Sequence, residues 1–463
     1  MRTIGVVNVI LAAALLLAAC GSKTGLPVDE LGTDSGTSTD RTATDAASGL
    51  DAARTAGDAA GTGDASTDGS AFVVDARVPR LDGSTIGFDG GGDPLGPVAG
   101  VAAGAHHTCV WRTTGQVQCW GRNANGQTGS PASVRVTAPR FVPGVAAIEM
   151  ALGARHTCAV DSDGVVKCWG LNTWGMLGVR EPERTHRPTR VSGLPPISRL
   201  AGGWSHTCAL SVSGEAFCWG KNDAGQIGNG TSLDQFRPVR VEGLESAVDV
   251  SVGRAHSCAV TVDGILRCWG ANFAGQRGVG GEGNSVRPLT VPGIEPVIRV
   301  RAGYESTCVV TRDGRLRCWG RPLGTSPVCI SGCRVPWRCD DPSLDAHPII
   351  PFAGSIARLA AGGQHACLVD TGGMLRCWGA NDRRQLGLDP TEGCDRSFCA
   401  EDEACLVGAP TAVVGDMARV ALGLEHSCAV DDSHRVHCWG DNEWAQAGGS
   451  GAIVPRPTRV SGL

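Results

Sequence analysis

The amino-acid sequence predicts an all-β protein, a seven-bladed β-propeller whose ring is closed by pairing of the N- and C-terminal strands. One motif recurs seven times with a period of about 50 residues, which indicates a repeat architecture. Each period contains four short β-rich runs, which is enough for one blade. The last run, residues 456–463, stops where the other repeats continue into a first strand. Residues 97–103 supply that missing strand.

Residues 1–20 are typical of an export signal, because Arg2 is followed by an apolar core at 6–17 that is too short for a membrane span. The sequence Leu-Ala-Ala-Cys at 17–20 resembles the bacterial lipobox. That resemblance implies cleavage before Cys20 and a lipid on its thiol; the alternative is an ordinary secretory signal with a chance cysteine. Gly21 favours the outer membrane over the inner. We therefore expect a bacterial envelope protein that meets the membrane only through the lipid on Cys20.

Residues 21–94 are predicted to be a disordered acidic tether of Gly, Ser, Thr, Asp and Ala, because they contain almost no large apolar side chains. They carry thirteen acidic and five basic side chains, a net charge of −8. Since the whole chain is −5 and the leader is +1, residues 95–463 are left with +2. A flexible coil of this length would span roughly 50 Å. The nearly neutral domain has no basic field for nucleic acid.

The second repeat shows the four strands in order. β-rich runs lie at 147–153, 156–160 and 165–170, and the fourth run lies at 187–194. Gly164 fits a three-residue hairpin loop with the glycine in the left-handed conformation. In that register the cysteines of the second and third strands face each other.

Export makes disulfides the preferred state of these cysteines, since the compartment is oxidising. The alternatives are reduced, buried cysteines or zinc bound by the His-x-Cys pairs. The predicted cross-strand pairs are Cys109–Cys119, Cys158–Cys168, Cys208–Cys218, Cys258–Cys268, Cys308–Cys318, Cys367–Cys377 and Cys428–Cys438.

Gly-x-x-His-Thr-Cys, Asp-Gly, Cys-Trp-Gly and Asn-x-x-Gly-Gln-x-Gly at this period resemble the regulator of chromosome condensation (RCC1-type) repeat. The resemblance covers residues 95–463 and implies a seven-bladed propeller. Members of that family act as exchange factors, light sensors, scaffolds and enzyme inhibitors, so the fold transfers and the function does not.

The repeated histidines are interpreted as structural hydrogen-bonding residues, one per blade, because a catalytic group needs a unique environment. Ser306 replaces the histidine in the fifth repeat, and the tryptophans of Cys-Trp-Gly are interpreted as core residues. Trp204 resembles a photoreceptor tryptophan but stands alone, which argues against a chromophore. The histidines are His107, His156, His206, His256, His365 and His426.

The fifth and sixth periods are lengthened by insertions at about 321–347 and 389–408, between the third and fourth strands. We expect one disulfide in each insertion and one between them, with the connectivity left open. Their cysteines are Cys329, Cys333, Cys339, Cys394, Cys399 and Cys405. The candidate partner-binding residues are Arg334, Trp337, Arg338, Glu401, Asp402 and Glu403. Alternatively, these side chains pack only against each other.

The sequence thus favours a monomeric, envelope-tethered module that binds an unidentified protein as a scaffold, receptor or inhibitor. No catalytic, cofactor-binding or metal-binding residues are expected, since no nucleophile or calcium-loop motif is present. The first alternative is an enzyme with a site at the central channel. It would require non-repeating acidic or histidine residues that converge on the axis, and none stands apart from the repeat. A second alternative is a structural surface protein without a single partner.

Overall fold

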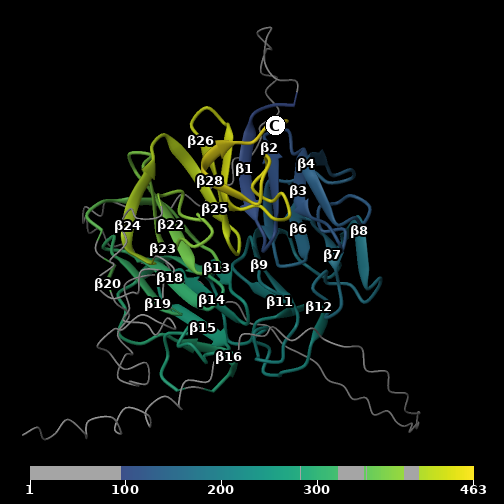
Figure 1. The fold of residues 1–463 in the computed structure, drawn as a ribbon. Helices are drawn as coiled ribbons and strands as arrows, with labels where there is room; N and C mark the ends of the chain where they lie inside the picture. The colour runs from purple at the N-terminus through teal and green to yellow at the C-terminus, as the bar shows by residue number, and fades with distance from the viewer. Residues whose placement is uncertain (1–94, 282, 322–348, 351, 390–405) are drawn as a thin grey trace, which may run out of the picture. The chain divides into compact units, whose positions relative to one another are not determined.

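The computed structural model describes residues 95–281, 283–321, 349–350, 352–389 and 406–463. In these residues, 28 strands form seven four-stranded antiparallel sheets, and no helix occurs. The sheets are the blades of a propeller (Figure 1). The predicted fold class and blade number are confirmed.

Each blade is built from consecutive strands. Blade 1 contains β1 (Val98–Ala103), β2 (His107–Arg112), β3 (Val117–Arg122) and β4 (Arg135–Phe141). Blade 2 contains β5 (Glu149–Leu152), β6 (His156–Val160), β7 (Val166–Leu171) and β8 (Arg184–Arg190). Blade 3 contains β9 (Ile197–Gly202), β10 (His206–Ser211), β11 (Ala216–Gly220) and β12 (Gln235–Arg240). Blade 4 contains β13 (Ala247–Val252), β14 (His256–Thr261), β15 (Leu266–Gly270) and β16 (Ser285–Thr290). Blade 5 contains β17 (Val297–Ala302), β18 (Ser306–Thr311), β19 (Leu316–Gly320) and β20 (Ile349–Ile350). Blade 6 contains β21 (Ile356–Ala361), β22 (His365–Asp370), β23 (Leu375–Ala380) and β24 (Leu406–Val414). Blade 7 contains β25 (Met417–Leu422), β26 (His426–Asp431), β27 (Val436–Asp441) and β28 (Ile453–Arg459).

The hairpin between the second and third strands forms as the sequence predicts. In blade 2, the Gly164 N–H donates to the Asp161 carbonyl over 3.0 Å, and Gly164 has a φ of 76°. This register places Cys158 opposite Cys168. A disulfide joins the facing cysteines of every blade, with the two Cα atoms 4.1 Å apart. The cross-strand bridge thus pins the register of the two central strands in each blade.

The expected pairing of the N- and C-terminal strands is wrong. β1 pairs with β2, and β28 pairs with β27. Each repeat supplies all four strands of its own blade, so neither terminal strand is left over to complete another sheet. The ring closes instead where the blue first blade packs beside the yellow last blade (Figure 1). There Trp120 Nε1 donates to the Gln446 carbonyl over 3.0 Å.

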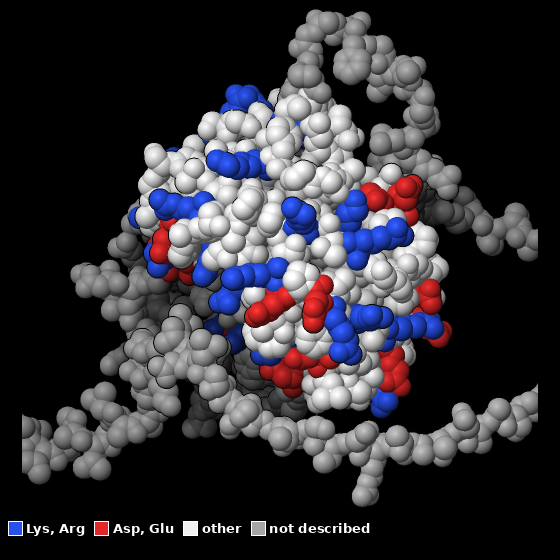
Figure 2. All heavy atoms as spheres, turned by 90° about the vertical axis from the view of Figure 1, so that its right-hand side faces the viewer, with Lys and Arg blue, Asp and Glu red and all other residues white. Residues whose placement is uncertain are grey.

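Within the described residues, the fourth strand of each blade has no neighbouring strand on its outer side. Five of these strands, those of blades 1, 2, 3, 4 and 7, carry exposed arginines next to prolines, such as Arg187-Pro188 in β8 and Arg237-Pro238 in β12. Proline lacks the N–H that a further strand would need, and exposed charge opposes pairing with another chain. Figure 2 shows basic and acidic side chains interspersed on this side of the propeller. In these five blades the outer edge is therefore protected by its sequence rather than by ring closure.

A ring of seven glycines holds the inner strands together. An added Cβ on Gly253 would lie 2.3 Å from the Gly303 carbonyl oxygen, and one on Gly423 would lie 2.5 Å from the Gly104 oxygen, which completes the circle. Backbone hydrogen bonds follow the same path, as from Tyr304 N to the Gly362 oxygen over 3.0 Å. The glycines are Gly104, Gly153, Gly203, Gly253, Gly303, Gly362 and Gly423. The repeat requires glycine here because adjacent blades touch through their backbones.

We expect Gly253→Ala to destabilise the propeller by about 1–3 kcal/mol, since the new methyl group must displace a neighbouring backbone. Urea denaturation of the two chains would measure the difference. The matched control is Gly283→Ala, where an added Cβ has open space and φ is not positive. Equal midpoints for the two variants would show that the ring tolerates a side chain at this level.

Candidate functional site

The repeated histidines form hydrogen bonds between adjacent blades. His156 Nε2 lies 2.8 Å from the Thr207 hydroxyl, which itself donates to the Met176 carbonyl over 3.1 Å. The same carbonyl accepts a hydrogen bond from Trp219 Nε1 at 2.9 Å. Because the hydroxyl proton goes to the carbonyl, the imidazole must donate through Nε2. This leaves Nδ1 without a proton.

The same contact occurs at six of the seven junctions. The pairs are His107–Thr157 (2.8 Å), His156–Thr207 (2.8 Å), His206–Ser257 (2.9 Å), His256–Thr307 (3.0 Å), His365–Ser427 (2.9 Å) and His426–Thr108 (2.9 Å). These contacts confirm the structural interpretation of the histidines and show that each bond spans two blades.

Burial keeps these imidazoles neutral. It lowers the pKa of His156 to about 4, and it lowers the pKa values of His206, His256 and His365 to about 3. A proton on Nδ1 would have no acceptor, because that atom is buried without a partner in each ring. The histidines therefore lie in the core as neutral hydrogen-bonding residues.

The junction between blades 5 and 6 departs from this pattern. Ser306 replaces the histidine. Ala366 replaces the Thr or Ser whose hydroxyl group would accept the hydrogen bond of that histidine. Within the residues the structure describes, Ser306 Oγ and Trp378 Nε1 are buried without a partner. The loss of both groups of the pair at the same junction explains why the histidine is dispensable there.

The loops between first and second strands, and those between third and fourth strands, open on one face of the ring, because first and third strands run in the same direction. We call this the loop face. Trp204 and Tyr304 meet there edge to face, with ring centroids 5.0 Å apart. The Arg254 guanidinium lies 5.1 Å from the Tyr304 ring centroid and 2.7 Å from Glu305, which also binds Arg321 at 2.7 Å. We call these five residues the mouth cluster.

Further aromatic and cationic side chains occupy the loop face. The Arg122 guanidinium lies 4.7 Å from the Trp444 ring centroid, and the Lys221 ammonium lies 5.0 Å from that of Trp174. Phe273 is 58% exposed in the equivalent loop of blade 4. The loop face therefore combines accessible aromatic surface with positive charge.

The mouth cluster borders a small cavity of about 90 Å³ on the propeller axis. Residues of all seven blades line it, including the glycine ring, and Trp204, Arg254 and Tyr304 stand at its rim. The cavity is too small for a drug-sized ligand, which needs about 300 Å³ or more. The rim, rather than the cavity, offers surface for recognition.

Sequence reasoning missed most of the mouth cluster. It considered Trp204 only as a chromophore residue and overlooked Arg254 and Tyr304. All three occupy the first variable position between the repeat glycine and histidine. A comparison of that position across the seven repeats would have identified them, since it is Ala, Ala, Trp, Arg, Tyr, Gly and Leu in turn.

The expectation that no acidic or histidine residues stand apart from the repeat near the axis is wrong for the acidic residues. Glu149 and Asp249 extend from inner strands, and each accepts a hydrogen bond from the next blade, at Leu200 N and Val300 N, both over 3.0 Å. The carboxylates thus satisfy N–H groups on the free inner edges, which otherwise have no partner strand. These contacts could not be predicted from the sequence, because the position varies between repeats and residues about 50 positions apart are brought together only in the ring.

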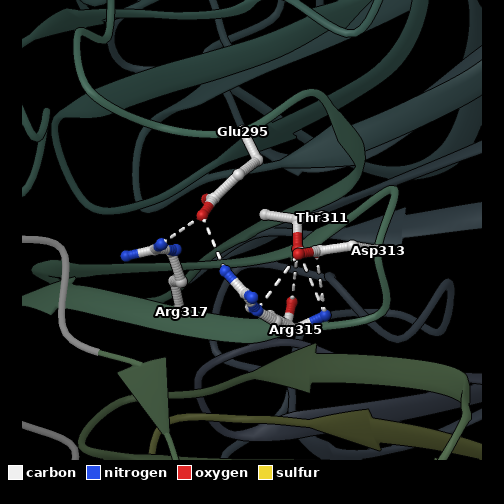
Figure 3. A network of polar contacts seen from close by, with 5 residues as sticks. All are labelled: Glu295, Thr311, Asp313, Arg315 and Arg317. Carbon is white, nitrogen blue, oxygen red and sulfur yellow. Dashed lines mark hydrogen bonds and ion pairs between the residues drawn. The ribbon is translucent and has the colours of Figure 1, made fainter.

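On the face opposite the loop face, exposed ion pairs connect blade 5 to the segment that precedes it. Glu295 lies 3.0 Å from Arg315 and 2.6 Å from Arg317, and Asp313 lies 3.1 Å from Arg315 (Figure 3). Exposed ion pairs contribute little to stability. This network fastens a hairpin and has no convergent geometry for chemistry.

Several predicted features lie outside the described residues. These are the signal and Cys20, the tether, the insertion cysteines Cys329, Cys333, Cys339, Cys394, Cys399 and Cys405, and the candidate binding residues Arg334, Trp337, Arg338, Glu401, Asp402 and Glu403. Among the residues that are described, no group of three or more His, Cys, Asp or Glu side chains could hold a metal ion. No helix in the same residues is long and apolar enough to cross a membrane.

Two sequence models of the Regulator of chromosome condensation (RCC1) repeat match this chain. One covers residues 114–160, 163–210 and 213–260. The other covers one segment in every blade: 98–127, 147–175, 197–226, 247–276, 297–322, 356–385 and 418–443. The chain belongs to the RCC1-repeat family.

Individual relatives are more distant. Protein pim1 of Schizosaccharomyces pombe is 29% identical over 156 residues, which cover 30% of this chain and 28% of pim1. The chain thus matches under a third of that relative's length. The crystal structure of Prp20p from Saccharomyces cerevisiae superposes with a TM-score of 0.65 at 22% identity, covering 79% of this chain and 86% of Prp20p. Human WBSCR16 gives a TM-score of 0.62 at 20% identity, covering 73% of this chain and 88% of that chain. At these identities the structures show the fold alone.

We call the six histidines of the blade junctions the histidine belt, and their burial makes the stability of the protein depend on pH. The pKa values of the buried imidazoles lie below the unfolded value of 6.5, so the unfolded chain binds more protons between pH 6.5 and 3. Stability should therefore be unaffected by these groups above pH 7 and should fall as the pH drops below 6.5.

The double variant His256→Ser/Thr307→Ala reproduces the natural pair at the junction of blades 5 and 6. As the pH drops from 6 to 4, the free energy of unfolding of this variant should fall less steeply than that of the native chain. The two slopes should differ by about 1.4 kcal/mol per pH unit. Urea titrations at several pH values measure both slopes. Parallel slopes would mean that His256 is not held neutral.

Proposed function

We propose that this chain is a protein-binding module that recognises its partner with the loop face. The mouth cluster is the observation that supports it. Tryptophan, tyrosine and arginine are the side chains enriched in binding hot spots. Trp204 and Arg254 each contact the Tyr304 ring, and the three residues come from three successive blades.

The distribution of exposed apolar residues supports the same face. The opposite face exposes single valines at hairpin tips, including Val212 at 70% and Val262 at 68%. Scattered aliphatic side chains are normal on a protein surface. The loop face instead presents Trp174, Phe273 and Trp444 around the mouth cluster. A partner that covers this face would bury aromatic surface at little cost in side-chain entropy.

The attachment of the insertions also favours the loop face. The first begins directly after β19, where Arg321 binds Glu305 of the mouth cluster. The second joins β23 to β24, and so it departs from the same face. In this proposal the candidate residues Arg334, Trp337 and Arg338 extend the surface that the mouth cluster starts.

Propellers of this family include protein binders. The structure of Prp20p is described together with its binding to Gsp1p and histones. That likeness supports protein binding as a use of the fold and says nothing of the partner here. The further parts of the proposal are that the lipid on Cys20 anchors the chain to the bacterial envelope and that residues 21–94 tether the propeller.

Binding through the loop face can be tested with paired variants. The native chain would be used to capture a partner from envelope and secreted proteins of the source organism. We expect Trp204→Ala/Tyr304→Ala to weaken binding of the purified partner at least 100-fold, as for the loss of two hot-spot residues. The control Val212→Ala/Val262→Ala should change the dissociation constant less than twofold.

Isothermal titration calorimetry with the purified partner measures both dissociation constants. A third chain lacking residues 322–347 and 390–405 measures the share of the insertions. Unchanged affinity in the Trp204/Tyr304 variant would place the binding surface elsewhere and reject the loop face.

Anchoring can be tested separately. In Cys20→Ser the lipid has no thiol to attach to, so the chain should move from the membrane fraction to the soluble fraction and lose incorporated radiolabelled palmitate. Ser22→Ala, which keeps Cys20, should behave as the native chain does. A Cys20→Ser chain that stays in the membrane fraction would contradict lipid anchoring.

A further inference from the structure

Five arginines on the inner strands surround the propeller axis. Four of them, Arg199, Arg299, Arg358 and Arg419, stand four residues before the repeat glycine, and Arg301 stands two residues before it. They come from blades 3, 5, 6 and 7. We call them the inner arginine cluster.

The arginines influence one another across the ring. Burial, together with the charges of Arg301, Arg358 and Arg199, lowers the pKa of Arg299 to about 10, although the charge of Asp249 opposes this shift. The charge of Arg301 in blade 5 also acts on Glu149 in blade 2. Side chains from distant blades therefore share one region, and their like charges are held together at a cost.

Protein carboxylates compensate this charge only in part. Asp249 binds Arg301 at 2.8 Å. Glu149 faces the same region, but its Oε1 accepts the Leu200 N–H, and burial raises the pKa of its carboxyl group. Two acidic groups thus stand against five guanidinium groups.

The remaining arginines have few partners. Arg299 and Arg358 both donate to the Ala357 carbonyl, over 2.7 and 3.0 Å. Among the described residues, Arg199 and Arg419 have neither an ion pair nor a hydrogen bond from their guanidinium groups. Hydrogen bonding to a backbone carbonyl on an inner strand therefore accounts for the presence of Arg299 and Arg358. It does not account for Arg199 and Arg419.

We propose that the inner arginine cluster binds a compact multivalent oxyanion, a molecule carrying several phosphate or carboxylate groups. The planar guanidinium group donates two parallel hydrogen bonds to such groups. An anion among the five arginines would supply the missing negative charge and relieve their mutual repulsion. The unpaired Arg199 and Arg419 are the residues most available to it.

This site is distinct from the loop face. The four arginines lie four residues before the glycine ring, which at about 3.3 Å per residue is roughly 13 Å along the axis. The glycine ring, with adjacent blades in backbone contact, lies between them and the mouth cluster. The two sites therefore open toward opposite ends of the axis, and this proposal does not depend on a protein partner.

Calorimetry on the purified full chain tests the proposal with inorganic tripolyphosphate and with citrate as probes, in 150 mM NaCl. The variant Arg199→Gln/Arg419→Gln should bind the preferred probe at least 100-fold more weakly, about tenfold for each lost charged contact. The control Arg190→Gln/Arg237→Gln removes the same charge from exposed outer strands and should change the affinity less than twofold.

Binding of either probe that is lost only in the Arg199/Arg419 variant supports the site, and the preferred probe identifies phosphate or carboxylate. Circular dichroism at equal temperature must show both variants folded, and Arg199→Lys/Arg419→Lys should retain part of the affinity. Absence of binding to both probes, or equal losses in the variant and the control, would overturn the proposal.

Discussion

The contact between glycines of adjacent blades is the constraint on which the whole propeller depends. Seven inner strands can meet around one axis only if the backbone of each blade reaches that of the next, and any side chain at this level would intervene. The histidine belt packs directly against the ring of glycines, since an added Cβ on Gly253 would also lie 2.3 Å from His256 Cε1. Glycine and histidine therefore recur together, and the disulfides hold the two strands that carry the belt.

This arrangement explains why the most regular residues of the chain are structural. Glycine, histidine, cysteine and tryptophan form the blade junctions, and each is buried or in contact with backbone. The junction between blades 5 and 6 supports this view, because Ser306 and Ala366 change together there. Residues that distinguish one blade from another are then the ones available for recognition, and they occur at the two ends of the axis.

The two ends differ in chemistry. On the loop face, Trp204 and Tyr304 combine with Arg254 into a surface of aromatic and charged groups, which suits the binding of a protein partner. On the inner strands, arginines dominate and aromatic side chains are absent from the variable position, which suits an anion. One scaffold thus carries two separate surfaces, and both arise from positions that the repeat leaves free to vary.

The sequence by itself determined the local structure. The period gave seven blades, the Asp/Gly turns gave the hairpins, and the register of Cys158 against Cys168 followed from the turn. It also identified the histidines as structural. The mode of closure, the mouth cluster and the inner arginine cluster were decided only by the tertiary structure. Trp204 and Tyr304 are 100 residues apart, and Arg199 and Arg419 are 220 residues apart. The physical reason is that the pattern within one repeat records contacts along a strand or across a hairpin. Which side chains meet around the axis depends on how far each blade is rotated from the last, and that is fixed only when backbone contacts close the ring.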